Sequence, residues 1–489
     1  MSATSEHPIF DAVVKVFLLK QYALFLSCWC AAFAVHAQDT WSLQKAIAYA
    51  QEHNLTIKQS QVNTELSNAT YLQSKLNLLP NLNGSANYGV NKGKNIDPTS
   101  NQFTNQSIQS GQASLSSSVV LFGGFTKLNE IKSNYYSYMS ARYATQQSVN
   151  DISLAVANAY LQVLYANELL QQSTENLTIA QSQQKRMQAL VTAGSAAEGQ
   201  LFEIDALVAS QELNQVTADN QRSLALLNLQ QLLDLDKPIA VEQPSVELPA
   251  DASRLTSADS IYDISVKTYP AVLSAQYGLS AAEKGFAAAR GRRYPTLSLF
   301  ANLSTNYANS VKRILSVDTT GNLLPVGYVV GSNDLVVAPE FNYNFEKTPF
   351  GDQIKDNFGQ AIGLSLQIPL FNGWGTNTAV KQSQLQMISS QINYETQRNN
   401  LLKDIRTAHA DATAAYNKLQ AATRQQTSAQ RAFDYAQQRL NAGAIASLDY
   451  DQAVRNRNAA QSDLLQAKYD YIFKLKVLDY YQGKPLTLP

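Results

Sequence analysis

Two stretches of about 70 residues contain neither glycine nor proline, and they constrain the fold of this chain more than any other feature. They cover 125–193 and 376–442. Glycine and proline are the residues that interrupt helices, and a helix rises about 1.5 Å per residue, so each stretch predicts a helix roughly 100 Å long. Small or apolar side chains recur every three to four residues over 152–191 and 401–440. This spacing is typical of a left-handed coiled coil.

The chain is duplicated, and three motifs recur in the same order in both halves. They are Leu78–Leu82 with Arg293–Leu297, Leu121–Gly124 with Leu370–Gly373, and Ala193-Gly194 with Ala442-Gly443. The first motif recurs after 215 positions and the other two after 249. Because two separate motifs keep one spacing, an internal repeat is indicated.

Each long helix is expected to end at its Ala-Gly pair, because glycine suits the left-handed conformation just past a helix end. A second helix follows each pair, so two helical hairpins are predicted. Ser195–Glu198 has the spacing of a capping box for the second helix of the first hairpin. The expected helices are about 42–78, 125–193, 197–233, 257–293, 376–441 and 447–481.

Four segments between the first two motifs alternate apolar and polar residues, as strands with one apolar face do. They are 82–90, 113–121, 297–305 (with Phe300 the exception) and 360–370. Each has the length of a tilted membrane strand. Barrels start near eight strands, so several chains would have to share one barrel; a small soluble sheet with one buried face is the alternative. The second half carries an insertion, within about Ala308–Asn357, that is expected to be a long surface loop.

The first 37 residues are expected to be a secretory signal peptide. Lysines precede an apolar run that ends in Val35-His36-Ala37, a small-x-small cleavage signal. Cys28 and Cys30 lie inside it, and no other cysteine occurs. Disulfides and thiolate metal sites are therefore excluded from the exported chain, and lipidation of Cys28 is left open.

Composition and motifs exclude several functions. The chain has 38 Lys+Arg and 38 Asp+Glu, so no basic surface for nucleic acid is indicated. Beyond the leader only His53 and His409 remain, and no catalytic or nucleotide-binding motif stands in a fitting context. We expect no enzyme activity, cofactor or metal. No apolar run of 18 residues follows the leader, so no transmembrane helix is expected, although an exported chain can still enter a membrane as a β-barrel.

The predicted organisation is two structural repeats. The ranges are 1–37, signal peptide; 38–234, first repeat, with a strand hairpin at about 82–122 and a helical hairpin at about 125–233; 235–256, Pro-rich connector; 257–483, second repeat, with a strand hairpin at about 297–371 and a helical hairpin at about 376–481; and 484–489, C-terminal tail.

The ordered set of motifs resembles the TolC-like outer-membrane efflux proteins over nearly the whole exported chain. The resemblance implies a mainly α fold with a membrane β-barrel part. Long coiled-coil hairpins would form a periplasmic tunnel, and four strands per chain would contribute to a shared twelve-stranded barrel in a homotrimer. The expected location is the outer membrane of a Gram-negative bacterium, in contact with its lipid and extending into the periplasm.

The implied function is a passive exit duct of a tripartite efflux or type I secretion system. It would dock on a periplasmic adaptor and an inner-membrane transporter, and conduct drugs, metal ions or polypeptides; the sequence does not choose among these cargoes. A trimeric coiled-coil surface or structural protein without transport activity is the alternative, and a secreted soluble enzyme is a more distant one. The coiled-coil alternative predicts one barrel-type anchor at one end and not two strand hairpins that are each followed by a helical hairpin. The enzyme would need a polar catalytic constellation, and the sequence shows none.

The resemblance also suggests where function lies. Family members close at the periplasmic tip with acidic rings, and Asp449 matches the first family aspartate, while Asp451 is one residue early for the second and Gln452 stands in its place. These three are the expected gate, unless the two aspartates only favour a helix N-terminus. The expected adaptor-docking tip is Gly194, Ser195, Gly443 and Ala444. The expected membrane-rim aromatics are Phe122, Phe371 and Trp374, for which ordinary packing is the alternative.

Overall fold

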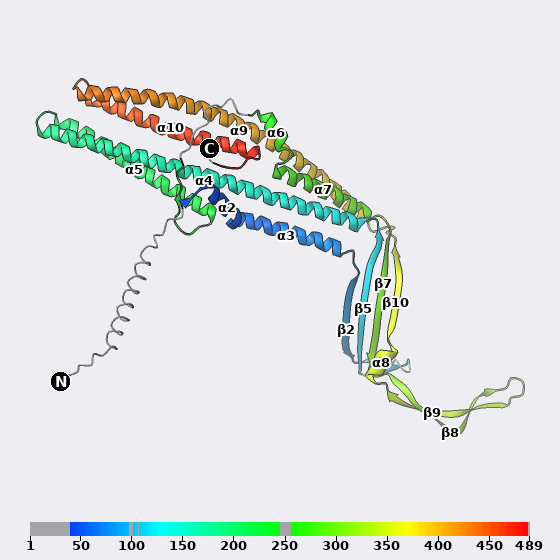
Figure 1. Ribbon diagram of the computed structural model, residues 1–489. Helices are drawn as coiled ribbons and strands as arrows, with labels where there is room; N and C mark the ends of the chain where they lie inside the picture. Colours follow the sequence, from blue (N-terminus) through cyan, green and yellow to red (C-terminus); the bar gives the residue numbers. More distant parts are fainter. Residues whose placement is uncertain (1–39, 97–100, 106, 245–255, 488–489) are drawn as a thin grey trace, which may run out of the picture. The chain divides into compact units, whose positions relative to one another are not determined.

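The computed structural model describes residues 40–96, 101–105, 107–244 and 256–487 (Figure 1). The predicted leader, 1–37, lies outside the described residues, as do residues 245–255 of the predicted connector. The chain divides into a helical unit and a unit built on a β-sheet. The first comprises Met1–Asn63, Arg142–Leu273 and Thr396–Pro489, and the second Thr64–Ala141 and Ser274–Glu395.

Four long helices form the two predicted hairpins, which confirms this part of the fold. They are α4 (Thr126–Thr192), α5 (Glu198–Leu233), α9 (Gly375–Asn441) and α10 (Ser447–Tyr481). The helices α4 and α9 contain 67 residues each. Every end lies within one residue of its predicted position, because no residue inside the two longest helices interrupts them and a glycine follows each.

The turns between the paired helices have the same backbone geometry. Gly194 has a φ of 72°, its N–H donates to the Val191 carbonyl (2.9 Å), and the Ser195 N–H donates to the Leu190 carbonyl (2.9 Å). The turn at Gly443, with a φ of 68°, repeats both bonds. This pair of bonds is the Schellman motif, so the expectation of left-handed glycines is confirmed.

The expected capping box at Ser195–Glu198 is wrong. The N-cap of α5 is Ala197, and no side chain caps the helix. Ser195 is held by the bond that closes α4, so it belongs to the end of one helix and not to the start of the next. Glu198 lies in the first turn of α5, where its charge still favours the helix dipole.

The helix expected at 42–78 is divided into α2 (Leu43–His53) and α3 (Leu55–Leu76). Asn54 separates them with an extended backbone (ψ 129°). Its Oδ1 accepts the Thr56 N–H (2.9 Å), and its Nδ2 donates to the Leu232 carbonyl (3.0 Å). The side chain thereby offers hydrogen bonds that compete with continuation of the helix.

The counterpart expected at 257–293 is divided as well. It consists of α6 (Ala258–Ser265) and α7 (Pro270–Gly291). Pro270 has no N–H to continue the helix from α6, and its ring disfavours a helical residue before it. Both predictions were wrong in treating each segment as one helix, because a single Asn or Pro inside a periodic pattern can end a helix.

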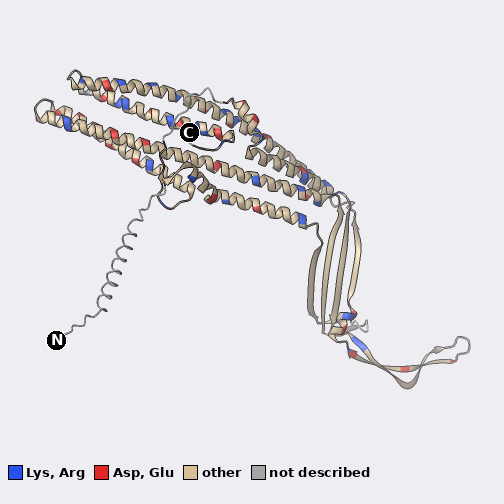
Figure 2. Ribbon diagram, in the orientation of Figure 1, with Lys and Arg blue, Asp and Glu red and all other residues tan. Residues whose placement is uncertain are grey.

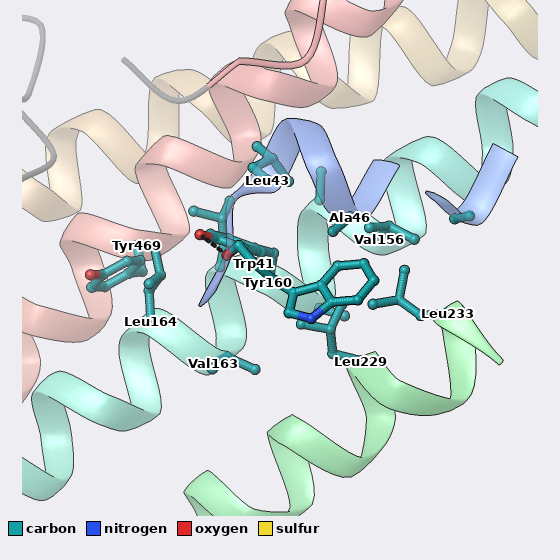
Figure 3. Close-up of a cluster of buried hydrophobic side chains, with 14 of the residues drawn as sticks. Trp41, Leu43, Ala46, Val156, Tyr160, Val163, Leu164, Leu229, Leu233 and Tyr469 are labelled. Atoms are coloured by element: carbon teal, nitrogen blue, oxygen red, sulfur yellow. Dashed lines mark hydrogen bonds between the residues drawn. The ribbon is translucent and has the colours of Figure 1, made fainter. Parts of the chain in front are cut away.

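The core of the helical unit gathers around Tyr160 of α4 (Figure 3). The Tyr160 hydroxyl lies 3.0 Å from the Trp41 carbonyl and 2.9 Å from the Glu242 carbonyl. These carbonyls belong to, or directly follow, a short parallel pair of strands, β1 (Thr40–Trp41) and β6 (Ala240–Val241). No periodicity indicated this pair, because a strand of two residues has no period.

The predicted coiled-coil seam is buried over most of its length. Its buried members are Val156, Ala159, Val163, Ala166, Ser173, Leu177 and Ala180 on α4, and Leu401, Ile405, Ala408, Ala412, Ala415, Leu419, Ala422, Phe433 and Ala436 on α9. Many are alanines, which let neighbouring helices approach closely. Burial at this spacing confirms that the 3.5-residue repeat marks the packed face.

The second unit is built on a four-stranded antiparallel sheet in the order β10-β7-β5-β2. Its strands are β2 (Asn81–Asn91), β5 (Ile108–Gly123), β7 (Thr296–Ala308) and β10 (Gly359–Gln367). They correspond to the four predicted segments. In the single chain, β2 and β10 are therefore the edges of this sheet.

The two faces of the sheet differ as the alternation predicted. Side chains such as Ile362 (78% exposed) and Leu364 (63% exposed) project from the apolar face. The other face is rich in serine and asparagine; Ser85 and Ser114 hydrogen-bond there across β2 and β5 (2.8 Å). Phe300, the exception to the alternation, lies opposite Gly363, whose missing side chain leaves room for the ring.

The insertion in the second half is not the expected loop. It forms a hairpin of β8 (Lys312–Tyr328) and β9 (Leu335–Lys347), followed by α8 (Phe350–Asp356). The hairpin pairs only with itself in a two-stranded sheet. The segment is rich in Val, Tyr and Phe, which have high strand propensity, and three register shifts disturb the alternation that would have indicated strands. A smaller hairpin, β3 (Lys94–Ile96) and β4 (Phe103–Asn105), lies between β2 and β5.

Charged residues are absent from the four strands of the sheet (Figure 2). Along the sequence, basic residues stand within a few positions of the strand ends, among them Lys75, Lys127, Arg292, Lys312 and Lys355. The charged residues therefore flank the four strands and do not lie within them. None of the described helices combines the length and the hydropathy that a membrane span requires.

Candidate functional site at the helical-hairpin turns

The four residues expected to form the docking tip are all exposed. Gly194 and Ser195 occupy the turn between α4 and α5, and Gly443 and Ala444 the turn between α9 and α10. A Cβ added at either glycine would meet no atom within 4 Å. The two turns thus present backbone and small side chains to open space, while their positive φ still requires glycine.

Hydrogen bonds join the two hairpins near these turns. Arg186 of α4 donates from Nη1 to Oδ1 of Asn441 at the end of α9 (2.7 Å). Gln183, one turn earlier on α4, donates from Nε2 to the hydroxyl of Tyr450 on α10. These hydrogen bonds hold the ends of the two hairpins close together.

The three residues expected at the gate differ in exposure. Asp449 and Gln452 are exposed on the first turns of α10, and Gln452 donates to Asn456 (2.8 Å) and accepts from Arg455 (3.0 Å). Asp451 is only 5% exposed. A side chain at 451 points to the opposite side of the helix from one at 449, so the two carboxyls cannot line the same surface.

Asp451 is an unusual buried acid. Its Oδ1 has no hydrogen-bond partner among the described residues. Burial raises the pKa of its carboxyl above the ordinary value, and the nearby Glu203 carboxyl of α5 also raises this pKa, while Arg455 opposes both effects. The site therefore favours a protonated, neutral Asp451 more than an exposed position would.

A cluster of buried polar residues adjoins Asp451 and was missed from the sequence. Tyr450 is 1% exposed and packs on Phe433 of α9, with ring centroids 5.8 Å apart. Arg457, one to two turns further along α10, lies over the same Phe433 ring at 4.2 Å. One aromatic ring thus joins the two helices of the second hairpin at this level.

Arg457 also links the second hairpin to the first. It is 5% exposed, and its Nη2 donates to Oδ1 of Asn176 on α4 (3.0 Å) and of Asn458 (2.7 Å). Burial lowers the pKa of its guanidinium, although Tyr450 and Asp434 oppose this. The positions 450, 454, 457, 460, 464, 467 and 471 follow the coiled-coil spacing. Extending the seam into α10 would have identified Arg457 as the one charged residue on it.

The three aromatic residues at the strand–helix junctions are exposed. Phe122 is 42% exposed and contacts Phe125 edge to face (centroids 5.7 Å apart), while Phe371 and Trp374 are 81% and 66% exposed. All three lie in or next to the uncharged strands, and Trp374 has the amphipathic ring that suits a membrane interface.

A groove of about 600 Å³ lies between α4 and α10 in the helical unit. Two carboxylates line it. Glu168 accepts hydrogen bonds from the Tyr469 hydroxyl and the Lys468 ammonium (3.4 Å), and Glu175 accepts from Gln171 Nε2 (3.0 Å). Within the described ranges, no three His, Cys, Asp or Glu side chains lie close enough together to hold a metal ion. The groove is thus a polar gap between helices whose charges are satisfied within the chain.

Comparisons with known proteins agree along most of the chain. A family model described as "Outer membrane efflux protein" matches residues 46–234 and 262–481. The pyoverdine export outer membrane protein OpmQ of Pseudomonas aeruginosa is 26% identical over 90% of this chain and 83% of its own length. The outer membrane efflux protein BepC of Brucella suis is 20% identical over 88% and 83%. The CmeC outer membrane channel of Campylobacter jejuni has the same fold, with a TM-score of 0.72, 16% identity and coverage of 90% and 85%.

Proposed function

Because the family model covers most of the chain, this protein belongs to the outer membrane efflux protein family and is located in the outer membrane, and we propose that three copies form a passive exit duct. In this proposal the strands of three chains close a twelve-stranded barrel in the outer-membrane lipid, and the helical hairpins line a tunnel through the periplasm. The duct docks on a periplasmic adaptor and an inner-membrane transporter, and it catalyses no reaction itself.

One observation supports the shared barrel most strongly. The four-stranded sheet has an exposed apolar face, no charge along its strands and two open edges. A single chain cannot close such a sheet, since four strands are too few. Open edges are avoided in lipid because unpaired backbone groups cost several kcal/mol there.

The mass of the detergent-extracted protein, measured by light scattering and corrected for bound detergent, tests this proposal. We expect three chains per particle and ion conductance when the particle is inserted in planar bilayers. A stable monomer would contradict the shared barrel. Three chains without conductance would favour the alternative, a trimeric structural protein without transport.

The proposed docking surface consists of Gly194, Ser195, Gly443 and Ala444. All four are exposed and surrounded by open space, which suits contact with a partner that inserts side chains between the turns. Ala444→Trp should abolish co-purification of the adaptor and leave the trimer mass unchanged, and Ala444→Ser should retain adaptor binding. Adaptor binding by both variants would rule out this surface.

The proposed gate consists of Asp449 and Gln452, since Asp451 is buried on another side of the helix. Three symmetric copies of the exposed Asp449 would form a ring that attracts cations. Asp449→Asn should reduce cation preference in planar bilayers, whereas Asp451→Asn should not. Unchanged cation preference in Asp449→Asn would refute the gate role.

The proposed membrane rim consists of Phe122, Phe371 and Trp374. Their exposure beside uncharged strands suits contact with lipid headgroups. Trp374 is the informative residue, because its fluorescence should shift to shorter wavelength and be quenched by brominated lipid when the protein is reconstituted. Phe replacements of Trp41 and Trp29 leave it as the only tryptophan. Quenching by aqueous iodide instead would place it outside the membrane interface.

A further inference from the structure

One face of the β8–β9 hairpin is apolar near its base, and it is called the apolar hairpin face below. It consists of residue pairs that lie opposite each other in the register, namely Ile314 with Phe345, Val317 with Tyr343 and Thr319 with Phe341. The three aromatic rings form a row, in which the Tyr343 centroid lies 6.5 Å from that of Phe341 and 6.4 Å from that of Phe345. The apolar side chains of this face are 45% to 53% exposed. The described residues of the chain therefore leave the face largely uncovered.

Hydrogen bonds within the chain satisfy the opposite face of the hairpin. Arg313 donates from Nε to Oε1 of Glu346 (2.6 Å) and from Nη1 to Oδ2 of Asp352 in α8 (2.9 Å). Further from the base, Asn344 donates from Nδ2 to Oδ2 of Asp318 (2.8 Å). This face has the composition and bonding of a surface in water, so the two faces of the hairpin suit different surroundings.

The helix α8 attaches the base of the hairpin to the end of β7. Gln353 is 2% exposed; its Oε1 accepts the Ala308 N–H (2.9 Å), and its Nε2 donates to the Thr348 carbonyl (2.9 Å). The Thr305 hydroxyl of β7 donates to the Ile354 carbonyl (2.9 Å). The hairpin thus leaves the sheet from a hydrogen-bonded base.

The apolar face of the sheet continues onto α8. Tyr307 of β7 has the same alternation as Leu299 and Leu303, so it lies on that face. Phe350, at the start of α8, contacts the Tyr307 ring with centroids 5.2 Å apart and is still 62% exposed. Lys347, the last residue of β9, precedes Phe350 by three positions. Exposed apolar side chains therefore lead from the strands to the base of the hairpin.

Two lysines lie at the base of the apolar hairpin face. Lys312 is opposite Lys347, and alternation places both on the same side as Ile314 and Phe345. Both lysines are exposed. Like charges directly opposite each other in a strand pair repel, so an anion beside them would stabilise the pair. The face therefore combines aromatic and aliphatic side chains with a positive end.

The half of the hairpin farther from its base is apolar on both faces. Its paired segments, Leu323–Tyr328 and Leu335–Pro339, contain no charged residue, and Val330 in the turn between them is fully exposed. The strands β8 and β9 pair only with each other, and a two-stranded hairpin without further packing is marginally stable in water. Exposed apolar surface of this extent marks a site of contact with a protein or a membrane.

We propose that the apolar hairpin face lies on the outer surface of the membrane, with Lys312 and Lys347 at the phosphates of anionic lipids. The hairpin lies at the end of the sheet away from the long helices, since β7 and β10 join α7 and α9 at their other ends (Figure 1). In the proposed duct this is the outer end. Aromatic and aliphatic side chains beside basic ones are typical of elements that lie in a membrane interface. The inference rests on the proposed function and adds a lipid contact outside the barrel.

Charge favours a lipid surface over a second copy of the hairpin as the occupant. A second copy that used the same face would bring its own Lys312 and Lys347 to the contact, and the like charges would repel. Phosphate headgroups bring the opposite charge, and each basic residue near an anionic surface strengthens binding about fivefold. The lysine pair therefore indicates anionic lipid and not another hairpin.

A fluorescent probe on single cysteines tests the contact, because the sequence has no cysteine beyond the predicted leader. Val317→Cys places a nitrobenzoxadiazole probe on the apolar hairpin face, and the matched Asn342→Cys places it on the polar face at the same distance from the base. Both particles are reconstituted in phosphatidylcholine vesicles that contain phosphatidylglycerol. Emission from position 317 should shift to shorter wavelength and be quenched by brominated acyl chains. Emission from position 342 should instead be quenched by aqueous iodide.

Replacement of a lysine tests the contribution of charge. In the Val317→Cys background, Lys347→Gln should lower the ratio of lipid-bound to free hairpin about fivefold at low salt in vesicles with phosphatidylglycerol. In vesicles of phosphatidylcholine alone it should have little effect. Lys418→Gln is the matched control, because Lys418 is an exposed lysine of α9 in the helical unit, and it should leave the ratio unchanged. Equal ratios for the two variants in anionic vesicles would contradict the role of the lysine pair.

The outcomes separate this contact from the proposed function. A three-chain, conducting particle in which iodide quenches position 317 as strongly as position 342 would overturn the lipid contact and leave the duct intact. Disulfide cross-links between copies through unlabelled Val317→Cys would assign the face to a second copy and also overturn the lipid contact. A particle with the mass of one chain would overturn the duct and, with it, the position of the hairpin at the outer surface.

Discussion

Asp451 and Arg457, in the first three turns of α10, are buried, and they have different local support. Arg457 is surrounded by amide oxygens and an aromatic ring, whereas Asp451 has one oxygen without a partner among the described residues. A buried charge without full hydrogen bonding destabilises the folded chain. Arg457 is therefore expected to stabilise the junction of the hairpins, and ionised Asp451 to weaken it.

The stability contributed by Asp451 should depend on pH. Folding raises the pKa of this carboxyl, so the folded state binds its proton more tightly than the unfolded state. Stability from this group is present below the ordinary pKa of 3.8 and is lost as the pH rises through the raised value. Asp451→Asn should raise the melting temperature relative to the wild type at pH 7, and this advantage should vanish near pH 4.

Circular dichroism at 222 nm in detergent measures this difference. Asp449→Asn is the matched control, because it removes an exposed carboxyl two residues away. The control should show no pH-dependent advantage. An Asp451→Asn variant that is less stable than wild type at pH 7 would contradict the destabilising role.

Loss of Arg457 should destabilise the packed hairpins. Arg457→Ala removes the contacts to Asn176 and Phe433 and takes a donor from a half-buried amide oxygen, at a cost of about 2 kcal/mol. Thermal melting should report the loss. Arg455→Ala is the control, since its partner Gln452 is exposed, and it should melt close to wild type.

At the scale of single elements, the predicted helix ends agree with the structure where a glycine ends the helix. Both 67-residue helices end at a left-handed glycine, which the sequence places without ambiguity. The shorter helices were predicted less well: Pro270 divides one of them, and the division of the other at Asn54 is also held by a hydrogen bond to Leu232, far away in the sequence. Local pattern alone does not contain such a partner.

Alanine at a hairpin turn should destabilise the protein because of its backbone conformation alone. Gly443 has a φ of 68°, and a Cβ added there would meet no atom within 4 Å, so Gly443→Ala should cost about 1 kcal/mol through strain. Gly199, in the first turn of α5, has open space and no positive φ. Gly199→Ala should stabilise the protein by about 0.5–1 kcal/mol. Denaturant titration measures both, and effects of the same sign would contradict this reasoning.

At the scale of the whole molecule, the two repeats use the same registers and turns, but the second carries the β8–β9 hairpin in addition. The base of this hairpin is attached through the Thr348 N–H, which donates to the Val311 carbonyl (3.0 Å). The hairpin contributes no strand to the four-stranded sheet. It is therefore an addition to the sheet and not part of its framework.

Replacement of residues 313–346 by a short Gly-Ser turn tests this view. The Thr348–Val311 bond and the bond from the Ala308 N–H to Gln353 Oε1 (2.9 Å) are kept in this variant. The mass of the extracted particle and its melting temperature should stay unchanged. A shift to monomers would indicate that the hairpin takes part in assembly. A comparable Gly-Ser replacement of residues 94–105, the β3–β4 hairpin, serves as the control.

The sequence by itself determined the repeat, the long helices, their glycine turns and the period-two strands, because each depends on residues that are neighbours along the chain. The tertiary structure decided what depends on distant partners. It placed Asp451 and Arg457 in a buried cluster, paired β5 with β7, and left β2 and β10 as edges. A residue's type sets its local conformation, but its burial and pairing are set by side chains that the fold brings from elsewhere in the chain.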